Sequence, residues 1–123
     1  MTASYQEEIA LSLCQLTVSS YCNLKSLLDW SCKPCKNSHL QIGNVKTFIN
    51  STGDVVGFIG TSSTMRSIVL VFRGTVPWDI KNWIKDIDFT PMSYPHCDNG
   101  CKVHEGFYKA YMEIRSGVLA AVN

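Results

Sequence analysis

Gly74 and Thr75, a glycine followed by a hydroxyl residue, are the first residues in this sequence whose position suggests chemistry. They come after Arg73 at the end of five consecutive apolar residues, 68–72. A short unbroken apolar run rich in β-branched residues predicts a strand buried on both faces, as in the centre of a parallel sheet. In open α/β sheets, ligands and reacting groups gather in the loop beyond the carboxyl end of such a strand. We therefore look for a functional site at Gly74, Thr75 and the residues that follow.

A second group with possible chemistry is the set of six cysteines, a number that favours an oxidising compartment over the cytosol in so short a chain. Cys32 and Cys35 have the Cys-x-x-Cys spacing of redox proteins, but no β-rich strand precedes them. A zinc site would also need Cys97 and Cys101, whose three-residue separation is atypical for zinc. The spacing alone leaves these readings open.

The N-terminal part of the chain predicts one helix followed by irregular structure. Ser4 and Glu7 have the spacing of a capping box, and a helical apolar stripe indicates a helix over residues 5–19. Residues 20–38 break this pattern and form a cysteine-bearing segment without regular structure. Within that segment the expected packing contacts are apolar: Leu24, Leu27, Leu28 and Trp30.

Two strands and a second helix are expected further along. Alternation over 45–50 and the run 55–59, separated by turn residues, predict an antiparallel hairpin. Beyond Gly106, apolar residues at steps of three and four predict a helix whose stripe faces a core. This helical stripe consists of Phe107, Tyr111, Ile114, Val118 and Val122. We find no repeat or linker and expect one domain over 1–123.

Composition limits the possible partners and location. A net charge of +1 gives no indication of nucleic acid or of a strongly charged membrane surface. No apolar stretch approaches the roughly 20 residues that span a bilayer. The first eight residues lack the pattern of a signal peptide, so a secreted form would need an upstream leader that has been removed. Asn50 begins an Asn-Ser-Thr glycosylation sequon at a turn, which supports secretion weakly.

Four segments in order carry a family resemblance: Val-Phe-Arg-Gly-Thr (71–75), Asn-Trp-Ile-Lys-Asp-Ile (82–87), Ser-Tyr-Pro (93–95) and Lys-Val-His-Glu-Gly-Phe (102–107). At this spacing they closely resemble the secreted class 3 triacylglycerol lipases of the fungal type, which are α/β-hydrolases with a Ser-Asp-His triad. The resemblance implies an α/β fold, the N-terminal portion of an α/β-hydrolase. Its parts would be a helix, a β-hairpin, a central parallel strand, a lid and a second helix, incomplete without a C-terminal half.

The resemblance also assigns catalytic roles. Acyl transfer from an ester needs hydrogen-bond donors aimed at the oxygen that becomes negative, and in α/β-hydrolases one donor comes from the loop after the third strand. By resemblance Thr75 is that residue, with its amide and its hydroxyl as donors. Asp86 matches an acidic residue that holds the oxyanion hydroxyl in place. A solvated surface position for Asp86, beside Lys85 and Asp88, is an equally open alternative.

Residues 77–82, which lie between Val76 and Trp83, are expected to be the lid over the active site. Proline suits the first turn of a helix, and tryptophan favours the boundary between membrane and water. An apolar side that covers the site in water could turn outward at a lipid surface. An ordinary core-facing helix is the alternative that periodicity alone would favour. The lid and substrate-contact residues are expected to be Val76, Pro77, Trp78, Ile80 and Trp83.

Parts of the catalytic machinery are absent from this chain. It has no Gly-x-Ser-x-Gly, and triad order in this fold places the histidine far downstream, so His104 is expected to be structural. The resemblance therefore implies that 1–123 is the N-terminal half of a lipase, with every triad member in a C-terminal half. We expect this chain alone to be inactive.

The resemblance extends to the cysteines. It favours a local disulfide between Cys32 and Cys35, and Cys97 and Cys101 look like a turn closed by a second one. The family cysteine that matches Cys22 pairs near the C-terminus, so a link to the C-terminal half would use Cys22 or Cys14. No metal or cofactor is implied.

The sequence therefore predicts lipid ester hydrolysis at a lipid–water interface by a secreted serine ester hydrolase. The main alternative is a non-catalytic, truncated lipase-like protein that binds lipid or a partner chain. A small disulfide or zinc module is a third possibility.

Overall fold

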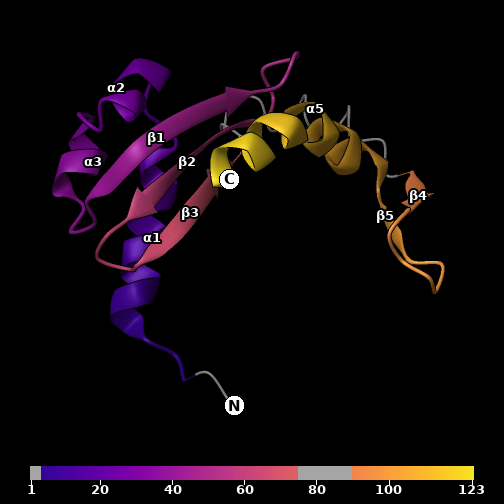
Figure 1. Cartoon of the computed structure of the whole chain (residues 1–123), viewed down its shortest axis with the longest axis horizontal. Coiled ribbons are helices and arrows are strands. Elements are labelled where there is room, and N and C mark those ends of the chain that lie inside the picture. Colours follow the sequence, from indigo (N-terminus) through magenta and orange to yellow (C-terminus); the bar gives the residue numbers. More distant parts are fainter. Residues whose placement is uncertain (1–3, 75–89) are drawn as a thin grey trace.

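A three-stranded antiparallel sheet forms the centre of the computed structural model, which describes residues 4–74 and 90–123 (Figure 1). Its strands are β1 (Ile42–Ile49), β2 (Val56–Ser62) and β3 (Ser67–Phe72), in that order across the sheet. β2 pairs with β1 on one side and with β3 on the other. The expected hairpin is confirmed, and both of its strands extend further than the alternating pattern indicated.

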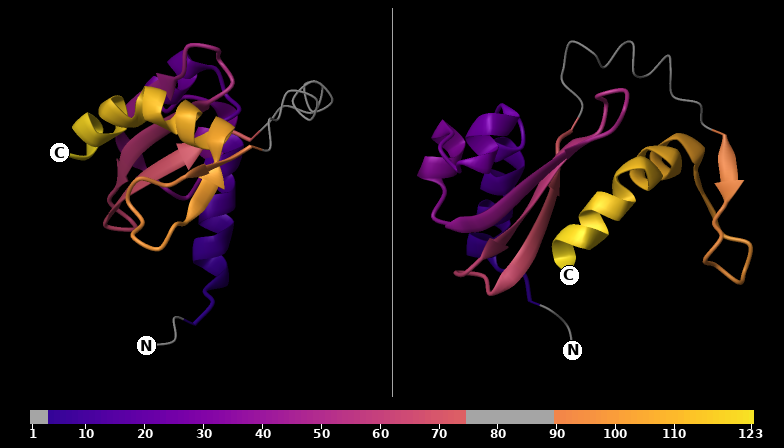
Figure 2. Two further views of the ribbon diagram at one scale, coloured as in Figure 1. Left: turned by 90° about the vertical axis from the view of Figure 1, so that its right-hand side faces the viewer. Right: turned by 45° about the horizontal axis from the view of Figure 1, so that its top comes forward.

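Helices lie on both sides of this sheet. Helices α1 (Glu7–Ser19), α2 (Leu24–Leu28) and α3 (Lys33–Asn37) cover one face. Helix α5 (Glu105–Val122) crosses the opposite face and packs against β1, as the right view of Figure 2 shows. The described residues thus form part of an α/β layered domain.

The starts of the N-terminal helices differ from the expectation. Helix α1 begins after Gln6, which makes no side-chain capping bond, so the proposed capping box at Ser4 is wrong. The segment expected to be irregular contains α2 and α3. Asn23 caps α2 by accepting a hydrogen bond from Ser26 N at 2.9 Å. Helices of one turn are too short to show a periodic pattern, which is why sequence reasoning missed them.

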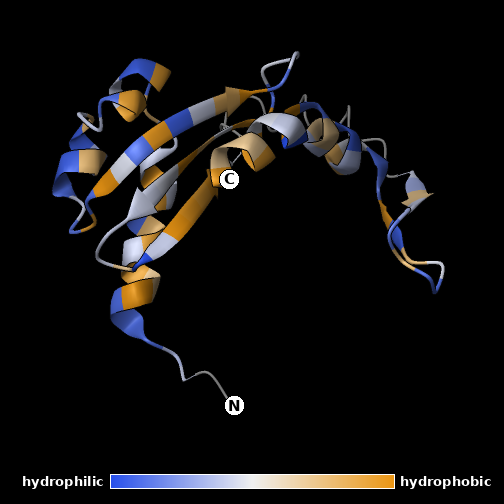
Figure 3. Ribbon diagram, viewed as in Figure 1, coloured by the Kyte–Doolittle hydropathy of each residue, from blue (hydrophilic) through white to orange (hydrophobic). Residues whose placement is uncertain are grey.

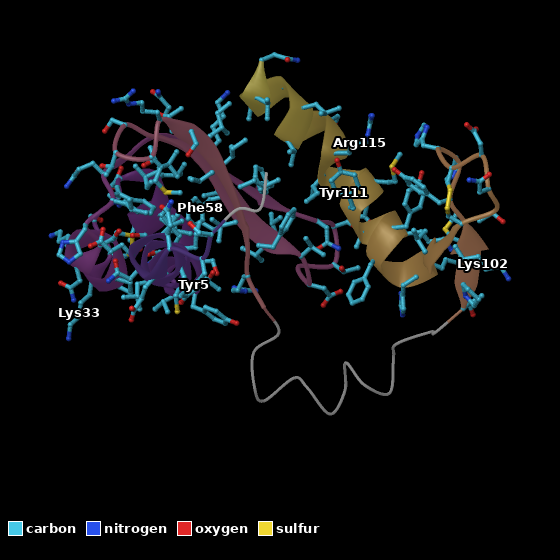
Figure 4. All side chains as sticks on the ribbon, turned by 90° about the horizontal axis from the view of Figure 1, so that it is seen from below. Tyr5, Lys33, Phe58, Lys102, Tyr111 and Arg115 are labelled. Atoms are coloured by element: carbon cyan, nitrogen blue, oxygen red, sulfur yellow. A yellow bond between two sulfur atoms is a disulfide. The ribbon has the colours of Figure 1, made fainter. Side chains whose placement is uncertain are left out.

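The main core lies between the sheet and the N-terminal helices. Phe58 on β2 is fully buried together with Leu16 and Leu27, and its ring centroid lies 5.6 Å from that of Trp30. Figure 4 shows the Phe58 side chain on the side of the sheet that these helices cover. Leu28 is 51% exposed, contrary to its expected packing role, because it falls on the outer side of α2.

Strand β3 is buried on one face only, so the expectation of burial on both faces is wrong. Val69 and Val71 point into the core, whereas Ile68, Leu70 and Phe72 are 40% to 49% exposed. The hydropathy colouring of Figure 3 shows the continuous apolar run along this strand. The physical reason is that α1 packs against β3 while α5 packs over β1. A parallel neighbour for β3 stays a prediction.

A small hairpin precedes α5. Its strands are β4 (Pro91–Ser93) and β5 (Lys102–His104), which sequence reasoning did not predict. His104 caps α5, since its Nδ1 accepts a hydrogen bond from Phe107 N at 3.4 Å. The structural role expected for His104 is therefore the one observed.

Only the middle of the α5 stripe faces a core. Ile114 and Val118 are buried, while Phe107, Tyr111 and Val122 are exposed. Figure 4 places the labelled Tyr111 and Arg115 on this helix. Within residues 4–74 and 90–123, no helix has the length and apolar character needed to cross a membrane.

The β1–β2 turn is closed by the Asn50 side chain. Its Oδ1 accepts a hydrogen bond from Val55 N at 2.9 Å, and its Nδ2 donates to Thr52 Oγ1 at 2.8 Å. Asn50 is only 7% exposed. Because so little of Asn50 is exposed, glycosylation of Asn50 stays a prediction that the folded turn does not favour.

Helix α5 holds the same turn through Glu113. Glu113 Oε2 accepts hydrogen bonds from the Ser51 backbone N at 2.9 Å and from Ser51 Oγ at 2.7 Å. The backbone bond is the main reason that the pKa of Glu113 is lowered, with the hydroxyl bond second. Because the folded pKa lies below the ordinary value of 4.5, the ionised carboxylate stabilises the turn above that pH.

We expect Glu113→Gln to weaken the tie between α5 and the turn. In the wild type the stabilisation is lost as the pH falls below 4.5 through the lowered folded pKa. In the variant this pH dependence is absent, and the Ser51 amide exchanges faster at neutral pH. Amide hydrogen exchange of Ser51, corrected for its intrinsic rate, is the measurement. Glu105→Gln on the same helix is the control, because Glu105 pairs with Lys109; equal loss of Ser51 protection in both variants would contradict the assignment.

Candidate active site

The carboxyl end of β3 positions the candidate site. Arg73 N donates a hydrogen bond to Val56 O at 2.8 Å, which extends the β2–β3 ladder by one residue. Gly74 follows as the last described residue before the segment 75–89. The strand therefore fixes the position of Gly74, which directly precedes the predicted oxyanion residue Thr75 in the sequence.

Tyr21, two residues beyond the end of α1, lies directly against Gly74. A Cβ atom on Gly74 would lie 2.6 Å from Tyr21 Oη, so only glycine fits here without displacing the phenol. The contact places the Tyr21 hydroxyl beside Gly74. Sequence reasoning missed Tyr21, because it lies far from Gly74 in the chain and no local pattern marks such a contact.

The predicted catalytic and lid residues lie outside the described residues. This holds for Thr75 and Asp86, and equally for the lid residues Val76, Pro77, Trp78, Ile80 and Trp83. Their roles remain predictions from sequence.

An apolar groove of about 370 Å³ runs between α1 and β3. Its walls are Leu13, Leu16 and Thr17 on α1, together with Met65 and the whole of Ser67–Phe72. Among the strands in the described ranges, β3 pairs with β2 alone. A sheet edge with an apolar groove beside it can accept another strand, because both its backbone groups and its side chains find partners there.

Both locally spaced cysteine pairs form disulfides. Cys32 and Cys35 are bonded with their Cα atoms 4.9 Å apart, and Cys97 and Cys101 with theirs 5.8 Å apart. The zinc site that would combine these four residues is not assembled in the described part of the chain. The group there whose ligand atoms converge is Cys22 with Cys32 and Cys35.

Two cysteines remain free thiols. Cys14 is exposed on α1, and Cys22 is half-buried just after that helix. Burial raises the pKa of the Cys22 thiol above its ordinary value.

Comparison with known proteins identifies the family. The family model described as lipase (class 3) matches residues 69–123. A lipase of Rhizomucor miehei is 32% identical over 108 residues, which cover 87% of this chain, and a secreted mono- and diacylglycerol lipase of Fusarium solani is 29% identical over 90 residues, which cover 72%. A solved triacylglycerol lipase, described as having a serine protease triad as its catalytic centre, superposes with a TM-score of 0.72 at 32% identity over 98% of the chain.

The described fold is thus part of an α/β-hydrolase domain. The chain belongs to the class 3 lipases. It spans 29% of the Rhizomucor lipase, 25% of the Fusarium lipase and 45% of the solved triacylglycerol lipase.

Proposed function

We propose that this chain is the N-terminal part of a triacylglycerol lipase that hydrolyses lipid esters through a Ser-Asp-His triad lying outside residues 1–123. The observation that carries the proposal is the superposition of 98% of the chain on a triacylglycerol lipase at 32% identity. The chain alone is inactive in this proposal, because it has no Gly-x-Ser-x-Gly nucleophile motif.

The contribution of this chain to catalysis is one side of the oxyanion hole. Thr75 follows Gly74 at the carboxyl end of β3, where α/β-hydrolases provide a donor from the loop after the strand. Its amide and hydroxyl would stabilise the tetrahedral oxyanion, while the amide after the missing serine supplies the other donor. Asp86 would hold the Thr75 hydroxyl in place. No cofactor or metal takes part in this chemistry.

The lid proposal concerns how the enzyme meets its substrate. In water the apolar side of the lid, with Val76, Trp78 and Ile80, would cover the active site. At a lipid–water interface the same side would turn toward lipid, because tryptophan is favoured at that boundary. The enzyme would then act on emulsified substrate in preference to dissolved ester.

The open side of β3 supports the proposal of a C-terminal half. Its apolar groove and strand edge are suited to a further strand from that half. A disulfide from Cys14 or Cys22 could join the two parts covalently. The two disulfides of this chain and the secreted relatives support an extracellular location.

The test is made on protein from the native source, captured with an antibody against residues 4–74. We expect hydrolysis of a triglyceride emulsion that a serine-directed phosphonate abolishes. Mass measurement should show a species heavier than the 13.7 kDa chain. A lone 13.7 kDa chain that binds the emulsion without hydrolysing it would refute the catalytic proposal and support the non-catalytic alternative.

A further inference from the structure

The loop that joins β4 and β5 carries the only Asn-Gly pair of the sequence, Asn99-Gly100. Both residues are exposed, and Figure 1 shows this loop projecting away from the sheet. The Cys97–Cys101 disulfide closes it into a small ring. Asparagine is among the thermolabile residues, because its side-chain amide is lost when the backbone nitrogen of the next residue attacks the side-chain carbonyl carbon. The chemical stability of Asn99 therefore depends on how freely Gly100 N can reach it.

Gly100 leaves its backbone nitrogen open to the Asn99 side chain. It has no side chain and a φ of 68°, and a Cβ atom added there would meet nothing within 4 Å. In the part of the chain that the structure describes, neither Asn99 nor Gly100 takes part in a hydrogen bond. No such bond has to break before the two groups meet.

Asn50-Ser51 has the same two reacting groups, but hydrogen bonds hold both of them. Asn50 Nδ2 donates to Thr52 Oγ1 at 2.8 Å, and Ser51 N donates to Glu113 Oε2 at 2.9 Å. Asn50 is also buried. The leaving amide and the attacking nitrogen are thus both engaged at this position, which makes Asn50 an internal control for Asn99.

We propose that Asn99 is a site of spontaneous deamidation, with water as the co-reactant. Gly100 N loses its proton to solvent and attacks Asn99 Cγ. The Cγ–Nδ2 bond breaks, and Nδ2 takes up a proton and leaves as ammonia, which gives a cyclic succinimide. Water then opens the ring at Cγ to give aspartate, or at the backbone carbonyl carbon to give isoaspartate. One water is consumed for each ammonia released, and no oxidation or reduction takes place.

The conversion changes both the charge and the backbone of the loop. A carboxylate at position 99 lies beside Asp98 and takes the formal net charge of the chain from +1 to zero. Isoaspartate also adds one methylene group to the backbone of the ring that Cys97 and Cys101 close. The deamidation proposal does not depend on lipase activity, so the two can fail separately.

Peptide mapping of protein from the native source provides the test. The folded protein is incubated at mildly alkaline pH in water enriched in heavy oxygen, then reduced, alkylated and digested with trypsin in ordinary water at mildly acidic pH. Peptide 86–102 contains Asn99 as its only asparagine, and peptide 47–66 contains only Asn50. We expect 86–102 to gain a carboxylate labelled with heavy oxygen, as a mixture of aspartate and isoaspartate that electron-based fragmentation distinguishes.

The expected difference between the two asparagines is large. Asn99 should convert roughly tenfold faster than Asn50 or more, since breaking even one typical hydrogen bond slows Asn50 by close to that factor. The rate at Asn50 is measured on copies without a glycan. Equal rates at the two positions would overturn the proposal. So would an Asn99 that stays intact in the folded protein but converts after denaturation, because the fold would then protect it.

Two glycine variants of the complete protein identify the attacking nitrogen. Gly100→Ala should slow conversion of Asn99, because a methyl group crowds the nitrogen that attacks. Gly117→Ala makes the same change within α5, also where a Cβ atom would meet nothing within 4 Å, and should leave the rate unchanged. Retention of the Cys97–Cys101 disulfide in both variants checks that the loop is intact. If Gly100→Ala converts at the wild-type rate, attack by Gly100 N is excluded and the proposal is wrong.

Discussion

Thr75→Pro in the complete enzyme is expected to lower kcat by roughly 10²–10³-fold with little change in KM. Proline has no backbone N–H, so the substitution removes the amide proposed to bind the oxyanion. That oxyanion exists only in the transition state and intermediate, which is why the loss falls on kcat. Gly74 before it tolerates the backbone restriction that proline imposes on its neighbour.

Two further substitutions separate the donors of Thr75. Thr75→Val keeps the amide and the branched shape but removes the hydroxyl, so it measures the hydroxyl contribution alone. Thr75→Ser keeps both donors and should be the least affected of the three. The measurement is the kcat of each variant on a triglyceride emulsion, compared with the wild type. Circular dichroism checks that each variant is folded. A folded Thr75→Pro enzyme with kcat within about twofold of the wild type would refute the oxyanion role.

The sequence predicted the elements whose signals are local. Turn residues around Gly53 indicated the β1–β2 hairpin, and steps of three and four indicated α5. The pairs Cys32–Cys35 and Cys97–Cys101 are close in sequence and bonded in the structure. Each of these features is determined by residues within a few positions, where spacing is informative.

The features that were missed depend on contacts between distant residues. Tyr21 meets Gly74, and Glu113 binds Ser51 across 62 positions. Strand β3 was expected to be covered on both faces because its residues are uniformly apolar, yet which face a helix covers depends on where α5 packs. The periodicity of a sequence does not indicate which helix packs on which face of a sheet. The roles of Thr75 and Asp86 rest on family resemblance alone.

The convergence of Cys22 on the Cys32–Cys35 disulfide has the same origin. Spacing gave no indication that Cys22 approaches Cys32 and Cys35, because the chain turns between α1 and α3 to bring them together. The grouping of these three sulfur atoms therefore follows from tertiary packing.

Gly57→Ala is expected to have the largest effect on stability, a loss of about 3 kcal/mol in the free energy of unfolding. Gly57 lies on β2, where a Cβ atom would come 2.5 Å from the Val71 carbonyl oxygen and 3.2 Å from Phe48 Cε2. The first of these neighbours is backbone, and β2 is held between β1 and β3, so neither strand can yield without breaking ladder hydrogen bonds.

Gly117→Ala is the matched control, with the same change in chemistry and the opposite expected sign. Gly117 lies within α5, and a Cβ atom there would meet nothing within 4 Å. Alanine in an open helical position stabilises by up to about 1 kcal/mol, because glycine loses more backbone entropy on folding. Denaturant unfolding of both variants gives the comparison. If Gly57→Ala unfolds at the same denaturant concentration as the wild type, the close approach of Gly57 to the Val71 carbonyl oxygen is contradicted. With that approach, there is no room for a side chain at position 57 between the two neighbouring strands.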